Sequence, residues 1–148
     1  MNIDILIHET AQVIRKLAAI GDTPVFEEDE GDIAQKIEIE VAQTHRCIVV
    51  GWNGCEHVAT QRPQGDDPDA LYVQPEIVVV VYESPVTNRA DEGAPRLLGM
   101  AAAIAKAVND LGTEDMDEGL HFVKISPIQQ LDRGVITCDV VFRTKNEI

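Results

Sequence analysis

Hydrophobic and polar positions divide the chain into segments with two different periods. From Asn2 to Ile20, apolar residues recur at helical spacing and form one stripe, and Gly21 is placed to end the helix. A second helix is predicted from about Ala94 to Leu111, where apolar residues step by three and four and Pro95 suits the first turn. Both patterns indicate amphipathic helices that pack on a core.

Alternating patterns predict strands elsewhere. Lys36 to Val41 reads K-I-E-I-E-V, which predicts a half-exposed strand in a hairpin with Cys47 to Trp52. Two closing strands are expected at about Leu120 to Gln130 and Val135 to Arg143. The predicted order is α-β-β-β-α-β-β. It corresponds to a single α+β domain over residues 1–148, with a mixed or antiparallel sheet and two helices packed on one face.

The predicted central strand, roughly Leu71 to Glu83, has an unusual apolar run. Residues 77–81 read I-V-V-V-V without a break, whereas a strand with one wet face should alternate. One face is expected to pack under the two helices. The other face is expected to contact a neighbouring copy of the chain, as a homo-oligomer would supply. The strand residues assigned to that contact are Ile77, Val79 and Val81.

The stretch from Asn53 to Asp69 is rich in Gly, Pro, Asp and Gln and predicts a long loop. Loops of that length in a compact domain tend to be functional or mobile. Charged residues of this loop, and one arginine of the loop after the central strand, are predicted to contact partners: Arg62, Asp66, Asp67, Asp69 and Arg89.

Composition and charge narrow the classes of function. The 148 residues are 45% hydrophobic, which is normal for a globular domain, and their formal net charge is −14. Such a surface repels phosphate backbones and anionic membranes, so docking on the outside of nucleic acid or on a membrane is not expected. The opening residues lack the pattern of a signal peptide, and the three cysteines form no C-x-x-C pair. A cytoplasmic protein with free thiols is expected.

The most enzyme-like segment is G-C-E-H at residues 54–57. Cys55 could act as a nucleophile with His57 as its base, but no glycine-rich elbow or orienting acid accompanies them. A zinc site that pools these two residues with Cys47 and His45 would lack the usual paired ligand spacing.

Three acidic clusters, at residues 27–32, 66–69 and 114–118, also lack the ordered ligand spacing of a calcium loop. Glycine-rich phosphate loops are absent from the sequence. We therefore predict no catalytic residue, no metal ligand and no cofactor.

The order of elements resembles that of the tail-terminator (tail-completion) proteins of long-tailed bacteriophages and Mu-like prophages. The chain opens on the amphipathic helix I-D-I-L-I-H-E-T-A-Q-V-I-R-K-L. A hairpin and a long polar loop then precede P-E-I-V-V-V-V-Y-E, and an alanine-rich helix, R-L-L-G-M-A-A-A-I-A-K-A-V, precedes a closing hairpin. The resemblance covers almost the whole chain and carries over no individual functional residue.

This resemblance implies a non-enzymatic structural protein. Such proteins form a ring, typically a hexamer, that caps the tail tube, ends its polymerisation and offers a surface for head docking. The implied partners are further copies of the chain, the tail-tube protein and the head connector, with DNA only as passing cargo. The implied location is the cytoplasm of the bacterial host during assembly and then the virion tail.

Two alternatives stay open. The first is another neck or baseplate protein of the same virus. The second is a small cytosolic enzyme or ligand-binding domain that uses Cys55 and His57.

Overall fold

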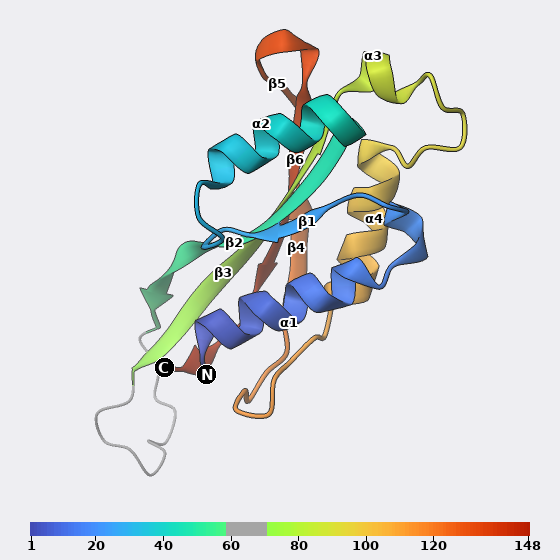
Figure 1. Cartoon of the computed structure of the whole chain (residues 1–148). Coiled ribbons are helices and arrows are strands. Elements are labelled where there is room, and N and C mark those ends of the chain that lie inside the picture. Colours follow the sequence, from blue (N-terminus) through green and yellow to red (C-terminus); the bar gives the residue numbers. More distant parts are fainter. Residues whose placement is uncertain (59–70) are drawn as a thin grey trace.

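The structure is a computed structural model that describes residues 1–58 and 71–148 (Figure 1). The helices within these residues are α1 (Ile3–Arg15), α2 (Ile33–Thr44), α3 (Pro85–Asn88) and α4 (Leu97–Val108), with short 3-10 helices η1 (Ala18–Ile20) and η2 (Asp132–Gly134). The strands are β1 (Val25–Glu27), β2 (Arg46–His57), β3 (Tyr72–Glu83), β4 (His121–Ile125), β5 (Gln129–Gln130), β6 (Ile136–Arg143) and β7 (Asn146–Glu147).

The strands form one mixed sheet in the order β1-β2-β3-β6-β4, and the predicted α+β class is confirmed. β1 runs parallel to β2, whereas the other pairings are antiparallel. β5 pairs with β6, and β7 pairs with β3. The two termini lie side by side, since the N-terminal ammonium of Met1 donates to the carbonyl oxygen of Glu147 at 2.8 Å (Figure 1).

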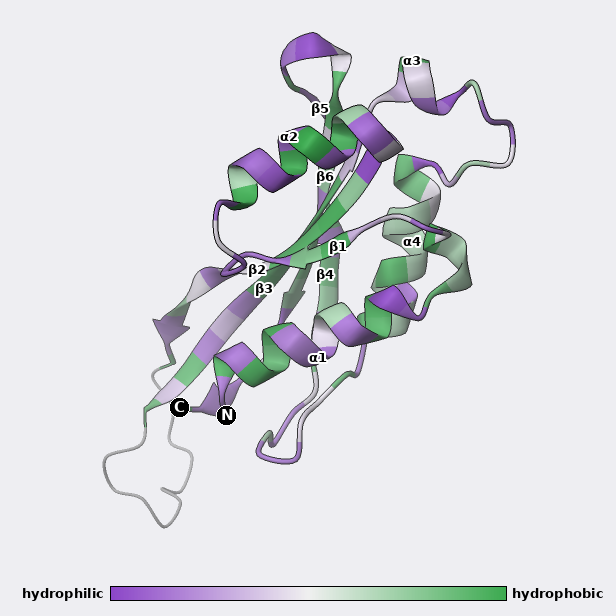
Figure 2. Ribbon diagram, in the orientation of Figure 1, coloured by the Kyte–Doolittle hydropathy of each residue, from purple (hydrophilic) through white to green (hydrophobic). Residues whose placement is uncertain are grey.

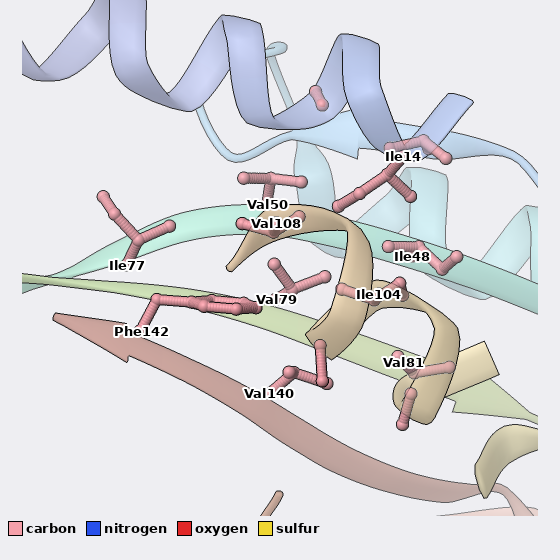
Figure 3. Packing of buried hydrophobic residues seen from close by; sticks show 14 of the residues in the cluster. Ile14, Ile48, Val50, Ile77, Val79, Val81, Ile104, Val108, Val140 and Phe142 are labelled. Atoms are coloured by element: carbon pink, nitrogen blue, oxygen red, sulfur yellow. The ribbon is translucent and has the colours of Figure 1, made fainter. Parts of the chain in front are cut away.

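The main core lies between the sheet and the two helices α1 and α4, on what we call the inner face. Ile77, Val79 and Val81 of β3 point into this core and are fully buried there (Figure 3). These three residues were predicted to lie on the sheet face that contacts another copy of the chain. That prediction is wrong, because they lie on the inner face. The pleat of the strand directs the odd-numbered side chains toward α1 and α4, inside the same chain.

The segment K-I-E-I-E-V lies in helix α2, which corrects the predicted strand. Asp32 caps this helix, because its side chain accepts a backbone N–H of the first turn at 3.1 Å. Ile33, Ile37 and Val41 are spaced by four residues and share one side of the helix. Ile39, which a strand would place with Ile37 and Val41, is 44% exposed. The alternating run K-I-E-I-E-V is therefore a short part of the longer helical pattern of α2.

Helix α2 packs on β2 and covers part of the sheet face opposite α1 and α4, which we call the outer face (Figure 1). Because α2 covers part of the outer face, the chain itself accounts for part of the unbroken apolar run of β3. Val78, Val80 and Tyr82, the outer-face residues of β3, remain half-buried. Figure 2 shows the hydrophobic colouring that runs along the middle of β2 and β3.

Other boundaries also differ from the prediction. β2 continues through residues 53–57, which had been assigned to the long loop, and its partners are β1 and β3 rather than residues 36–41. The predicted strand 120–130 divides into β4 and β5 around Pro127, a residue that cannot donate to a sheet. Among the described residues, no helix is both long and apolar enough to span a membrane.

Candidate interaction surface

A groove on the outer face has a volume of about 800 Å³. It lies between α2 and the segment that joins β5 to β6. Its apolar lining comes from both sides and from the floor of the sheet: Ile37, Val41, Tyr82, Leu131 and Val135. Across it, Arg133 Nη1 lies 3.5 Å from Glu38 Oε1, and both side chains are well exposed. An apolar hollow bridged by one exposed ion pair suits a contact with another protein.

Two buried polar atoms near this groove have no hydrogen-bond partner among the described residues: His45 Nδ1 and Thr137 Oγ1. His45 ends α2 in a left-handed conformation and lines the groove. Thr137 lies directly opposite Tyr82 in the sheet. Burial raises the pKa of the Tyr82 phenol, with smaller contributions from the charges of Cys47 and Asp139. Buried polar atoms without partners are costly, so hydrogen bonding in this region is less complete than in the network around Arg46.

At one end of the inner face, the apolar core gives way to a buried polar network around Arg46. Its guanidinium donates to Asp22 Oδ1 at 2.6 Å, to Thr23 Oγ1 at 2.9 Å and to Asn88 Oδ1 at 2.6 Å. Asn88 in turn donates to Glu83 Oε1 at 2.7 Å. Arg46, Glu83 and Asn88 are all buried, so the network fixes the ends of β2 and β3 relative to α3.

The same network positions helix α4. Glu83 Oε2 accepts the backbone N–H of Leu97 at 3.2 Å, at the first residue of the helix. A carboxylate at that position also interacts favourably with the helix dipole. Sequence reasoning missed this network, because none of its residues forms a recognisable motif and they come together only in the fold.

Carboxylates of the acidic run 27–32 contact basic side chains of two helices. Glu27 lies 3.0 Å from His8 Nδ1 and 3.4 Å from Arg15 Nη2. Glu30 lies 3.5 Å from Arg15 and 3.8 Å from Lys36. Together with the Asp32 cap, these contacts connect α1, β1 and α2.

The remaining predicted site residues fall into two groups. Arg62, Asp66, Asp67 and Asp69 lie outside the described residues. Arg89 is exposed directly after α3, where it is available for a contact.

Cys55 and His57 are both exposed near the end of β2, and within the described contacts no hydrogen bond joins them. Cys55 lines a shallow polar hollow with Glu76 and Arg143. In the described part of the chain, no group of three or more His, Cys, Asp or Glu residues lies close enough together to hold a metal ion.

Comparison with known proteins finds similarity among solved structures. No protein-family profile and no curated protein matches the chain. A chain in a solved structure described as "Virion of native gene transfer agent (GTA) particle" is similar, with a TM-score of 0.50 and 16% sequence identity. The alignment covers 94% of this chain and 92% of that chain. At this identity the likeness shows a shared fold, and it extends over nearly the whole of both chains.

Proposed function

We propose that the chain is a structural protein of a virion, and more specifically a tail terminator. In this role, copies of the chain form a ring, typically a hexamer, on the growing tail tube. The ring ends polymerisation of the tube and offers the surface on which the head docks. The tail-tube protein and the head connector are its partners, and the chain acts without enzymatic chemistry.

The observation that carries this proposal is the shared fold with a chain of a virion. The likeness extends over 94% of this chain and 92% of the other, so it concerns the whole domain rather than one common motif. The opening amphipathic helix, the long apolar strand and the alanine-rich helix resemble those of tail terminators independently of that comparison, although the first strand of the predicted hairpin before the long loop is helix α2 in the structure.

The described surface is compatible with a structural role. The apolar groove on the outer face has the composition of a protein contact. The net charge of −14 also suits the wall of a channel through which DNA must pass without binding, because like charges repel.

The proposal is tested by deleting the gene in the strain that encodes the chain and measuring tail lengths by negative-stain electron microscopy. A terminator predicts tails of abnormal and variable length that carry no heads, and normal tails when the gene is supplied in trans. Tails of normal length with heads attached would contradict the proposal. Loss of all tails would instead favour a neck or baseplate role earlier in assembly.

A further inference from the structure

The two edges of the sheet present different surfaces. β4 is the edge strand on one side and β1 on the other, with β2, β3 and β6 between them. Four strand spacings separate the two edges by about 19 Å. If the β4 edge of one copy contacted the β1 edge of the next copy, the copies would add head to tail in the direction perpendicular to the strands.

The edge at β4 presents apolar and basic side chains. Phe122 and Val123 are 40% and 39% exposed, although neighbouring Phe142 is fully buried. Lys106 of α4 lines the same hollow as Phe122, and Lys124 follows Val123 in β4. A shallow hollow of about 570 Å³ runs between α4 and β4, with small residues on the helix side. We call this surface, defined by Lys106, Phe122, Val123 and Lys124, the β4 patch.

Among the described residues, neither lysine of the β4 patch has a carboxylate at ion-pair distance, a feature that they share with Lys16, Arg89, Arg96 and Lys145. The pKa of Glu76 is lowered mainly by its hydrogen bond with Asn53, but the charge of Lys124 is nevertheless one of the smaller causes. At the start of β4, His121 Nε2 lies 3.6 Å from Glu118 Oε2. In a chain of net charge −14, two lysines beside exposed apolar residues give this edge a local charge opposite in sign to that of the whole chain.

The edge at β1 presents apolar and acidic side chains. A notch of about 180 Å³ lies between the start of α1 and the edge of the sheet. Ile3, Ile7 and Trp52 line it, and Trp52 is 37% exposed. Asp4 and Asp29 are exposed at its rim. We call this surface the Trp52 notch.

We propose that the β4 patch of one copy docks into the Trp52 notch of the next copy. Lysine suits such a notch, because its aliphatic stem can lie along Ile3, Ile7 and Trp52 while its ammonium group meets the carboxylates of the rim. The exposed rings of Phe122 and Trp52 add apolar area on both sides.

The charges also exclude a symmetric pairing. Two β4 patches would bring lysines against lysines, and two Trp52 notches would bring carboxylates against carboxylates. Only the unlike pairing is attractive, and a contact between unlike surfaces generates a ring when its rotation closes. The inference rests on the proposed ring, and it names the two surfaces that hold that ring together.

The test is charge reversal on each surface separately. One variant carries Lys106→Glu and Lys124→Glu, and the other carries Asp4→Lys and Asp29→Lys. Controls with the same changes in net charge are Lys16→Glu with Lys145→Glu, and Glu92→Lys with Glu114→Lys, all at exposed positions. Assembly is measured by mass photometry and multi-angle light scattering, and folding by thermal unfolding.

Each reversal alone should raise the concentration needed for assembly by at least about tenfold relative to its control. Mixing the two variants should restore assembly, because the reversed patch of one meets the reversed notch of the other. Restoration on mixing also shows that both variants are folded. Assembly of each variant alone at the concentration of its control would overturn the inference.

These outcomes separate the contact from the function. If the natural chain forms rings and both variants do so equally well, the named surfaces are wrong while the ring stands. If the natural chain does not associate even at high concentration and salt, the contact fails, and the tail-length measurement then decides the function independently.

Discussion

Arg46 and Glu83 lie directly opposite each other on β2 and β3, and the side chain of Asn88 bridges them. Its oxygen accepts from Arg46 Nη1 at 2.6 Å, and its nitrogen donates to Glu83 Oε1 at 2.7 Å. All three side chains are buried. One amide from the short helix α3 thus satisfies two charged groups at the end of the sheet and fixes the loop that leads to α4.

Replacing Asn88 with alanine should lower the free energy of unfolding by about 3 kcal/mol, because it leaves two buried charged groups short of a partner. Urea unfolding measures this directly. The matched control is Thr87→Ala at the exposed neighbouring position, which should change the stability by less than about 0.5 kcal/mol. An Asn88 variant as stable as this control would show that the bridge contributes nothing.

Because residues 33–44 form a helix, lysine substitutions at Ile39 and Val41 should have unequal effects on the free energy of unfolding. Ile39→Lys should change the stability by less than about 0.5 kcal/mol, because Ile39 points to solvent. Val41→Lys should cost at least about 2 kcal/mol, because Val41 is buried against the sheet. Equal destabilisation by the two substitutions would favour a strand, in which both residues share one face.

That pair of residues also shows where sequence patterns succeed and where they do not. The stripes of α1 and α4 and the run of β3 are long, so a single period dominates and the α+β class follows. K-I-E-I-E-V is too short to separate two periods, although Asp32 as a cap and Ile33 as an earlier stripe member pointed to a helix. The pairing of Arg46 with Asn88, 42 positions apart, depends on the tertiary fold and leaves no local pattern.

The three cysteines should react in two distinct classes. Cys55 is exposed, whereas Cys47 and Cys138 are buried. Burial, with a smaller effect from Glu40, raises the pKa of the Cys47 thiol to about 12. Burial, with a smaller effect from Asp139, raises the pKa of the Cys138 thiol to about 11.

Since the thiolate is the reactive form, a thiol reagent at neutral to mildly alkaline pH should rapidly modify one cysteine in the native protein and all three after unfolding. A Cys55→Ala variant should show no rapid phase. Rapid modification of two or three thiols in the native chain would contradict the packing around β2 and β6.

Self-association should depend strongly on salt. Two compact chains of this size in contact have centres about 40 Å apart. At a charge of −14 each, their repulsion in water without salt is about 20 kcal/mol, which exceeds what a few surface contacts supply. Salt at 0.1 M, with a Debye length of about 10 Å, removes most of this repulsion.

The purified chain should therefore be mainly monomeric when dilute at low salt and should associate as salt, divalent cations or protein concentration rise. Light scattering across a salt and Mg²⁺ series measures the change in mass. A mass that decreases as salt increases would show that local ion pairs, rather than the net charge, control the assembly.

The location of the chain in assembled particles tests the proposed function most directly. Particles from the strain that encodes the chain are labelled with antibody and gold and imaged by electron microscopy. The account predicts label at a single position, the end of the tail tube that faces the head, in every complete particle. Label along the whole tube, label at the distal tip, or particles that contain none of the chain would contradict it.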